Sequence, residues 1–129
     1  MTGKQIIDPG WAYHKAFQYS QAVRAGGLLH LAGQCPVDAQ GNTVAAGDVR
    51  GQTRQVFENL KAVLAAAGLT LDDVVEIVSY HTDMADLPAV AEVKAEYLTH
   101  DFPAWTAVGV TALAFPGQLL EIKATALAG

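Results

Sequence analysis

Apolar residues in the middle of the chain recur at spacings of three and four, which predicts an amphipathic helix. Its stripe consists of Val49, Thr53, Val56, Phe57, Leu60, Val63, Leu64 and Ala67. Asp48 precedes the stripe as a candidate N-cap, and Gly68 follows it as a candidate C-cap. A shorter stripe over residues 87–98 predicts a second helix. Both stripes need a sheet to cover.

Segments rich in β-branched residues or alternating in polarity predict that sheet. We expect strands over residues 18–24, 28–37, 74–81, 105–110 and 119–127, with the first two joined as a hairpin through Ala25-Gly26-Gly27. Residues 1–16 give mixed signals and are expected to be irregular. The order β-β-α-β-α-β-β predicts an α+β fold in a single domain, residues 1–129, with a largely antiparallel sheet and two helices on one face.

The predicted sheet has a second face that is unusually poor in charge. Its strands are apolar or neutral on both sides, apart from Glu76, Glu121 and Lys123. Charged residues make up only 16% of the chain, which is low for a small monomer. We therefore expect the open face to be buried against other copies of the chain, with pockets between subunits.

Composition narrows the classes of function. The net charge is −5, and eight scattered basic residues supply no patch for nucleic acid. Neither a run of 18 apolar residues nor a signal-peptide pattern is present, so we expect a cytoplasmic protein with no membrane partner. Cys35 is the only cysteine and the four histidines are scattered, which argues against a disulfide and a structural zinc site. The sequence indicates no cofactor, because it contains no phosphate loop and no dinucleotide motif.

The strand over 105–110 raises a specific question. Trp105, Ala107 and Gly109 share one face, and the β-branched set on the other face is expected to pack. That set is Thr106, Val108 and Val110. The space beside Trp105 is filled by a closely packed helix, or it is a pocket with the indole as its wall.

Glu121 is the main candidate for chemistry, because it lies in the middle of an apolar strand. It shares a face with Lys123 and Thr125, so it either pairs with a neighbouring charge or serves as a carboxylate with a raised pKa that binds or moves a proton. His81 is either a structural histidine or a hydrogen-bonding partner for a ligand. Tyr19 is either a buried aromatic or a hydroxyl donor in a pocket.

Two loop positions complete the candidate list. Gly33 marks a place where the pleat needs no side chain or where a ligand comes close. Cys35, before Pro36, is most simply a small buried hydrophobe, and Asp83 is expected to cap the turn into the second helix.

Three stretches resemble the Rid family, also called YjgF: "YSQAVRAGGLLHLAGQCPVDAQGN", "NLKAVLAAAGL" before "DDVVEIVSYHTD", and "FPAWTAVGVTALAFPGQLLEIKATA". The likeness covers roughly residues 17 to 127. It implies a chorismate-mutase-like α+β fold, a homotrimer and ligand clefts between subunits. The best-known branch hydrolyses reactive enamines and imines, such as 2-aminoacrylate, to keto acids and ammonia.

The resemblance assigns roles position by position. Tyr19 matches a tyrosine of the first strand, Gly33 matches the glycine of the "SGQ"-type turn, and Glu121 matches the glutamate thought to bind the attacking water. The arginine that clamps the substrate carboxylate in that branch is Trp105 here. Ala107 stands in place of a cysteine.

Lys123 replaces a second glutamate of the family pattern. The chain thus resembles a divergent branch without the arginine, in which Lys123 or His81 would supply the missing positive charge.

The resulting expectation is a hydrolase or deaminase that acts on an imine, an enamine or a related small electrophile and does not favour 2-aminoacrylate. Glu121 would deprotonate water, Tyr19 and the backbone around Gly33 and Ala107 would orient the substrate, and His81 would assist proton transfer. Trp105 would favour a neutral, flat or aromatic ligand. The alternative is a homotrimer that binds a small molecule without turning it over. Ribonuclease activity is disfavoured by the acidic charge balance.

Overall fold

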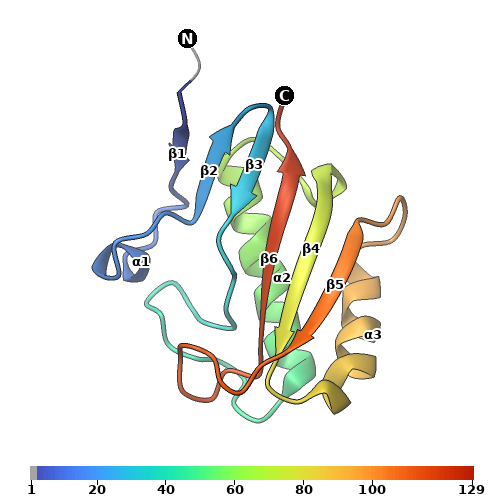
Figure 1. Cartoon of the computed structure of the whole chain (residues 1–129). Coiled ribbons are helices and arrows are strands. Elements are labelled where there is room, and N and C mark those ends of the chain that lie inside the picture. Colours follow the sequence, from blue (N-terminus) through green and yellow to red (C-terminus); the bar gives the residue numbers. More distant parts are fainter. Residues whose placement is uncertain (1–2) are drawn as a thin grey trace.

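The computed structural model describes residues 3–129, and Met1 and Thr2 lie outside it. Six strands form one sheet in the order β1-β2-β3-β6-β4-β5. Figure 1 shows the sheet in front, with the helices α2 and α3 together behind one face. The strands are β1 Gln5–Ile7, β2 Ala22–Ala25, β3 Leu28–Leu31, β4 Val74–His81, β5 Ala104–Gly109 and β6 Leu120–Leu127. The fold is α+β with a mostly antiparallel sheet, as the sequence predicts.

Helix α2 (Val49–Ala66) follows the predicted stripe closely. The Asp48 carboxylate accepts a hydrogen bond from the Gly51 amide at 3.0 Å, and Gly68 adopts a left-handed φ of 76° just beyond the helix. The predicted N-cap is confirmed, whereas the C-cap residue is Ala67 and Gly68 is the left-handed residue that follows it. Caps of this kind satisfy backbone groups that a helix leaves unpaired at its ends.

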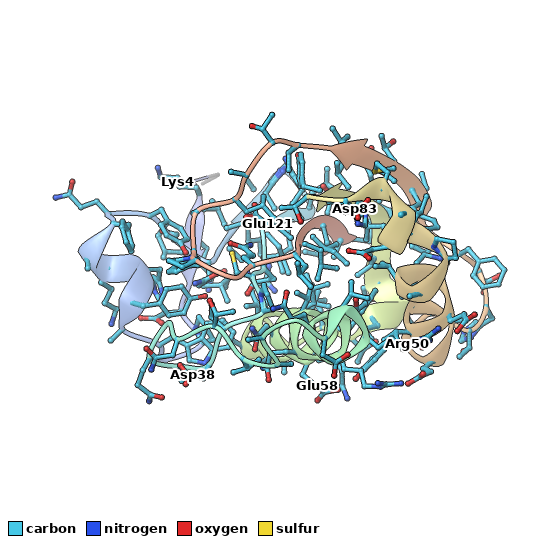
Figure 2. All side chains as sticks on the ribbon, turned by 90° about the horizontal axis from the view of Figure 1, so that it is seen from below. Lys4, Asp38, Arg50, Glu58, Asp83 and Glu121 are labelled. Atoms are coloured by element: carbon cyan, nitrogen blue, oxygen red, sulfur yellow. The ribbon has the colours of Figure 1, made fainter. Side chains whose placement is uncertain are left out.

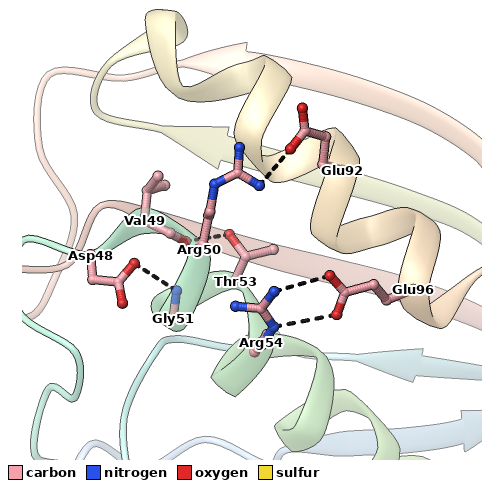
Figure 3. A network of polar contacts seen from close by, with 8 residues as sticks. All are labelled: Asp48, Val49, Arg50, Gly51, Thr53, Arg54, Glu92 and Glu96. Atoms are coloured by element: carbon pink, nitrogen blue, oxygen red, sulfur yellow. Dashed lines mark hydrogen bonds and ion pairs between the residues drawn. The ribbon is translucent and has the colours of Figure 1, made fainter.

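Helix α3 (Leu87–Tyr97) lies beside α2, and two ion pairs join their outer faces. Figure 3 shows Arg50 reaching Glu92 at 2.6 Å and Arg54 reaching Glu96 at 3.0 Å. These side chains are largely exposed, so their contribution to stability is small. The helix layer is held mainly by apolar packing.

The β4-α3-β5 unit makes the only parallel pair of the described sheet. Two short 3₁₀ helices, η1 (Leu71–Asp73) and η2 (Met84–Asp86), flank β4. The Asp83 side chain accepts from the Ala85 amide at 2.9 Å, which confirms the predicted cap before α3. A parallel connection of this kind needs a crossover, and α3 supplies it.

The core lies between the sheet and the helices. It is built from the inward residues of every long element, among them Leu29, Val56, Phe57, Leu60, Leu64, Ile77, Val90, Leu120, Ile122, Ala124 and Ala126. On β6 the buried set alternates with Glu121, Lys123 and Thr125, which therefore share the open face as predicted.

The prediction that residues 1–16 are irregular is wrong for two short elements. Strand β1 pairs antiparallel with β2 at the edge of the sheet, and α1 (Tyr13–Ala16) forms one helical turn. Pairing with a neighbouring strand decides the first of these, which local sequence does not reveal.

The hairpin strands are shorter than predicted. Tyr19 precedes β2, because the chain turns after α1 and Gln18 adopts a left-handed φ of 58°. Strand β3 ends at Leu31, and Gln34 then makes an isolated bridge to Ile122 on β6. Gly33 therefore lies where the chain detours between the end of β3 and that bridge.

The packing assignment on β5 is also wrong. Thr106 and Val108 are exposed, whereas Trp105 and Ala107 are partly buried and pair in register with Ile77 and Ser79, inward residues of β4. The faces alternate as predicted, but the helix layer covers the indole. Tertiary packing under α3 decides this, and β-branching alone cannot.

Candidate functional site

A cleft of about 590 Å³ lies at the end of the sheet where β6 begins. Three segments line it: the turn after α1, the chain after β3 and the loop before β6. The lining residues are Phe17, Tyr19, Ala32, Gly33, Cys35, Ala114, Phe115, Pro116 and Glu121. The cleft thus brings together three predicted site residues that are far apart in sequence: Tyr19, Gly33 and Glu121.

Glu121 reaches the cleft because of strand parity. Its neighbours Leu120 and Ile122 are buried in the core, so its own side chain must project from the opposite face. In Figure 2 Glu121 is labelled near the middle of the view, beside the loop that leads into β6, whereas Asp38 and Glu58 lie at the lower edge. The side chain is half-buried and lines the cleft.

Gly33 leaves the space that the Glu121 carboxylate occupies. A Cβ atom on Gly33 would lie 2.0 Å from Glu121 Oε2, far inside van der Waals contact. The φ of Gly33 is not in the left-handed range, so sterics and not backbone conformation explain the glycine. The "AGQ" turn and the β6 carboxylate are parts of one site.

Two donors hold the other oxygen of Glu121. The Cys35 thiol and the Gln118 amide each approach Oε1 at 3.4 Å. The described contacts leave Oε2, on the side of Gly33, without such a partner. A carboxylate fixed through one oxygen keeps the other available to accept a proton or a hydrogen bond.

Cys35 acts here as a thiol and not as a thiolate. Burial raises its pKa to about 12, and the negative charge of Glu121 adds to the effect. The sequence expectation of a small buried residue agrees with this, although the sequence did not predict its contact with Glu121. An undissociated thiol is a hydrogen-bond donor and a poor nucleophile.

Helix α2 fixes the loop that closes the cleft. Buried Gln52 donates to the Gly117 carbonyl at 2.9 Å and accepts from the Leu119 amide at 2.8 Å. Thr43 donates to the Pro116 carbonyl at 2.9 Å.

Gln118 makes the contacts within this loop: it accepts from the Phe115 amide and donates to the Leu120 carbonyl. The loop is thus held at both ends of its turn, which positions Gln118 beside Glu121.

A second polar chain supports the wall that carries Tyr19. Gln34 donates to Gln21 at 2.8 Å, and Gln21 donates to the Tyr13 hydroxyl at 3.1 Å. The His14 ring packs 5.9 Å from the Tyr19 ring. Desolvation raises the pKa of Tyr19, and the nearby Cys35 and Glu121 raise it further. Tyr19 therefore presents a protonated hydroxyl to the cleft.

Aromatic rings form the outer wall. The Phe17 and Phe115 rings meet edge to face, with centroids 6.2 Å apart, and Tyr13 packs on Phe115 at 6.1 Å. Phe17 is 67% exposed. The cleft therefore combines one carboxylate with a largely apolar, aromatic surface.

Trp105 lies outside the cleft of the protomer. Its indole N–H donates to the Ser79 hydroxyl at 2.8 Å, and the Lys94 ammonium sits 4.6 Å from the ring centroid. Burial lowers the pKa of Lys94. In the protomer a helix therefore covers the Trp105 ring, which agrees with the interpretation that a closely packed helix fills the space beside it.

His81 belongs to the same buried group. Its Nε2 atom lies 2.7 Å from the Ser79 hydroxyl, and its side chain is almost completely buried. Desolvation lowers its pKa, so the ring is neutral at pH 7. It lies on the helix-covered face, opposite to Glu121, and not in the cleft.

Two further predicted residues do not line the cleft in the protomer. Ala107 pairs with Ser79 on the covered face. Lys123 shares the open face with Glu121 but is exposed, and among the described residues it has no carboxylate partner. The predicted alternative of a Glu121–Lys123 ion pair is not formed.

Sequence reasoning missed the aromatic wall and the supporting amides. Phe17 and Phe115 stand beside turns, and Gln52 lies on the buried side of α2, where its polarity was the available signal. A glutamine inside an apolar stripe must find a partner, and its partner is the loop of the site.

Comparisons with known proteins agree with this geometry. Residues 12–128 match the family model described as Endoribonuclease L-PSP. A RutC family protein of Pyrococcus horikoshii is 46% identical over 108 residues, which cover 84% of this chain and 85% of the relative. The solved structure of protein YjgH superposes with a TM-score of 0.86 at 38% identity and covers 95% of both chains. The predicted chorismate-mutase-like α+β fold is confirmed.

Some similar proteins carry deaminase names. A 2-iminobutanoate/2-iminopropanoate deaminase of Dermatophagoides farinae is 35% identical and covers 88% of both chains. A 3-aminoacrylate deaminase RutC of Acinetobacter baylyi is 36% identical and covers 95% of this chain and 97% of its own. The extent and identity of these matches show that the chain belongs to the Rid (YjgF) family.

Proposed function

We propose that the protein is a hydrolytic deaminase of small imines or enamines, with Glu121 positioning and deprotonating the attacking water. The observation that carries the proposal is the position of the Glu121 carboxylate and the way it is held. It is the only charged group among the residues that line the cleft, and its Oε1 atom is held by Cys35 and Gln118. Relatives named as imine and enamine deaminases support the same kind of reaction.

The chemistry needs a base and an acid in turn. Glu121 Oε2 accepts a proton from water as the water oxygen adds to the carbon of the protonated imine, which gives a neutral carbinolamine. The carboxyl group then returns this proton to the nitrogen. As the C–N bond breaks, the carboxylate takes the hydroxyl proton and passes it to the departing ammonia, so that a carbonyl compound and ammonium remain. One carboxyl group serves both steps, and general acid–base catalysis of this kind contributes about 10²–10⁴-fold.

Tyr19 and Gly33 are proposed to orient the substrate. Tyr19 lines the same cleft as the carboxylate, and Gly33 leaves the room in which the Glu121 carboxylate lies beside the backbone of the turn. As in the family resemblance, we propose that the working molecule is a homotrimer whose cleft is completed by a neighbouring copy.

The test is replacement of Glu121 by Gln, which keeps shape and hydrogen bonding but removes the base. An amino-acid oxidase generates imines in the presence of semicarbazide, and hydrolysis appears as loss of trapped product. We expect Glu121→Gln to lower the catalysed rate about 100-fold or more, while Glu58→Gln, an exposed acid on α2, leaves it unchanged.

The same experiment separates catalysis from binding alone. If Glu121→Gln retains full activity, the mechanism is wrong. If neither protein hydrolyses any imine but small amines or carbonyl compounds raise the melting temperature, the protein binds a metabolite without turnover.

A further inference from the structure

The cleft contains a negative charge and no positive one. Its lining residues include no lysine, arginine or histidine. All three arginines of the chain are engaged elsewhere: Arg50 and Arg54 pair with glutamates of α3, and Arg24 binds Gln5 and the Ala67 carbonyl. A substrate carboxylate would therefore meet Glu121 without any guanidinium to compensate it.

The remaining lysines do not change this balance within the protomer. Lys15 and Lys61 pair with Asp8 and Glu58, and Lys94 covers the Trp105 ring. Lys4 and Lys123 are exposed, and both lie outside the cleft lining. The electrostatics of the cleft favour a cation and disfavour an anion.

The aromatic wall suits the same class of ligand. Phe17, Tyr19 and Phe115 line the same cleft as the carboxylate, and Phe17 is 67% exposed. Ring faces attract cations, and they also cover apolar groups. An exposed phenylalanine at the mouth of a cleft is covered at least cost by an apolar part of a ligand.

We propose that the substrate is the protonated imine R–CH=NH2+ that forms when a primary amine is oxidised. Its group R is apolar or aromatic and carries no carboxylate. This inference rests on the proposed function and names the substrate for the same site. The iminium nitrogen faces Glu121, and the apolar group lies against Phe17 and Phe115. The reaction balances as R–CH=NH2+ plus water giving R–CHO plus NH4+, so the products are an aldehyde and ammonium.

Two substrates isolate the carboxylate. A flavin amine oxidase converts benzylamine into the imine of benzaldehyde, and an amino-acid oxidase converts phenylglycine into the same imine bearing a carboxylate. Both reactions run with semicarbazide, with and without the full-length protein. We expect the rate acceleration to be at least about 10-fold greater for the imine from benzylamine, because an unpaired charge in a cleft is costly.

The outcomes separate the two proposals. Preference for the carboxylated imine, with Glu121 still required, overturns the substrate class and leaves the deaminase intact. Hydrolysis of neither aromatic imine, with Glu121-dependent hydrolysis of 2-iminobutanoate, has the same meaning. Absence of hydrolysis for every imine overturns the deaminase and the substrate class together.

Phe17 offers a matched test of the aromatic wall. We expect Phe17→Ala to lower kcat/KM for the benzylamine imine about 10-fold and to affect the imine of methylamine much less. Phe102→Ala serves as control, because Phe102 is 69% exposed and lies outside the cleft lining. Equal effects of both variants would contradict a role of Phe17 in binding.

A further variant adds a positive charge at the mouth of the cleft. Phe17→Arg supplies the missing guanidinium on an exposed position, so folding is not at risk. We expect it to shift the preference toward the imine from phenylglycine. A preference that stays fixed would show that this wall does not contact the substituent.

Discussion

At the scale of single residues, the site depends on one missing side chain and one charged one. The Glu121 carboxylate occupies the volume that a side chain on Gly33 would need. Cys35 and Gln118 hold its Oε1 atom, which leaves Oε2 toward Gly33. Sterics and two hydrogen bonds thus fix the direction in which the base points.

Replacement of Gly33 by Ala should displace this carboxylate. A Cβ at 2.0 Å from Oε2 forces Glu121 to move, so we expect about 1–3 kcal/mol of destabilisation in urea unfolding and loss of imine hydrolysis. Gly3→Ala is the control, because no atom lies within 4 Å of its added methyl group. In the double variant Gly33→Ala/Glu121→Ala the stability should return, since the clashing atoms are gone. A purely additive double variant would contradict the steric explanation.

Trp105 provides a second prediction at this scale. The Trp105→Phe variant keeps the aromatic ring but loses the hydrogen bond to Ser79, so we expect about 1 kcal/mol of destabilisation. Because the ring lies under α3 and outside the cleft lining, kcat/KM should change less than twofold. A large loss of activity at unchanged stability would mean that Trp105 reaches the cleft of a neighbouring copy.

At the scale of elements, strand β4 buries a titratable residue beneath α3. His81 and Ser79 project to the covered face, and Trp105 of the adjacent β5 donates to the Ser79 hydroxyl that also contacts His81 Nε2. The Nδ1 atom of His81 is buried without a hydrogen-bond partner among the described residues. Burial lowers the pKa of His81, and the carboxylate of Asp86 opposes this only in part. The folded strand therefore tolerates the neutral ring and not the imidazolium.

This burial predicts acid sensitivity. With the folded pKa below the unfolded value of about 6.5, the unfolded chain binds the extra proton in the window between them. The contribution of neutral His81 to the free energy of unfolding is complete above the unfolded pKa of about 6.5 and is lost as the pH falls through the folded pKa. We expect the free energy of unfolding of the His81→Gln variant to fall less steeply than that of the wild type from pH 6.5 to pH 5.

At the scale of the whole molecule, the sheet has one covered face and one open face. Figure 1 shows both long helices on the same side. The other face presents Val78, Tyr80, Thr106, Val108, Lys123 and Leu127. We predict that this open face of the sheet meets other copies of the chain.

No helix among the described residues is both long enough and apolar enough to cross a membrane.

The assembly prediction is direct to measure. We expect light scattering to report three times the chain mass of 13.6 kDa, and Val108→Arg to shift the protein toward a monomer, since an unpaired charge in an interface is costly. Ala62→Arg, on the exposed side of α2, should leave the mass unchanged. A wild-type monomer would contradict the trimer.

Local chemistry along the chain determined the helices, their caps, the long strands and the side of β6 from which Glu121 projects. These features follow from periodicity and nearest neighbours, so a single chain is sufficient to predict them. The pairing of β1 and the early ends of β2 and β3 depend on distant partners and escaped prediction.

The tertiary structure alone decided which candidates share a site. Glu121, Gly33 and Tyr19 meet because the bridge from Gln34 to Ile122 brings the chain after β3 against β6. Trp105 and His81 lie on the other face, because α3 crosses over β5 and buries them. Strand alternation is visible in sequence, but the face that receives the helices is fixed only when the elements pack.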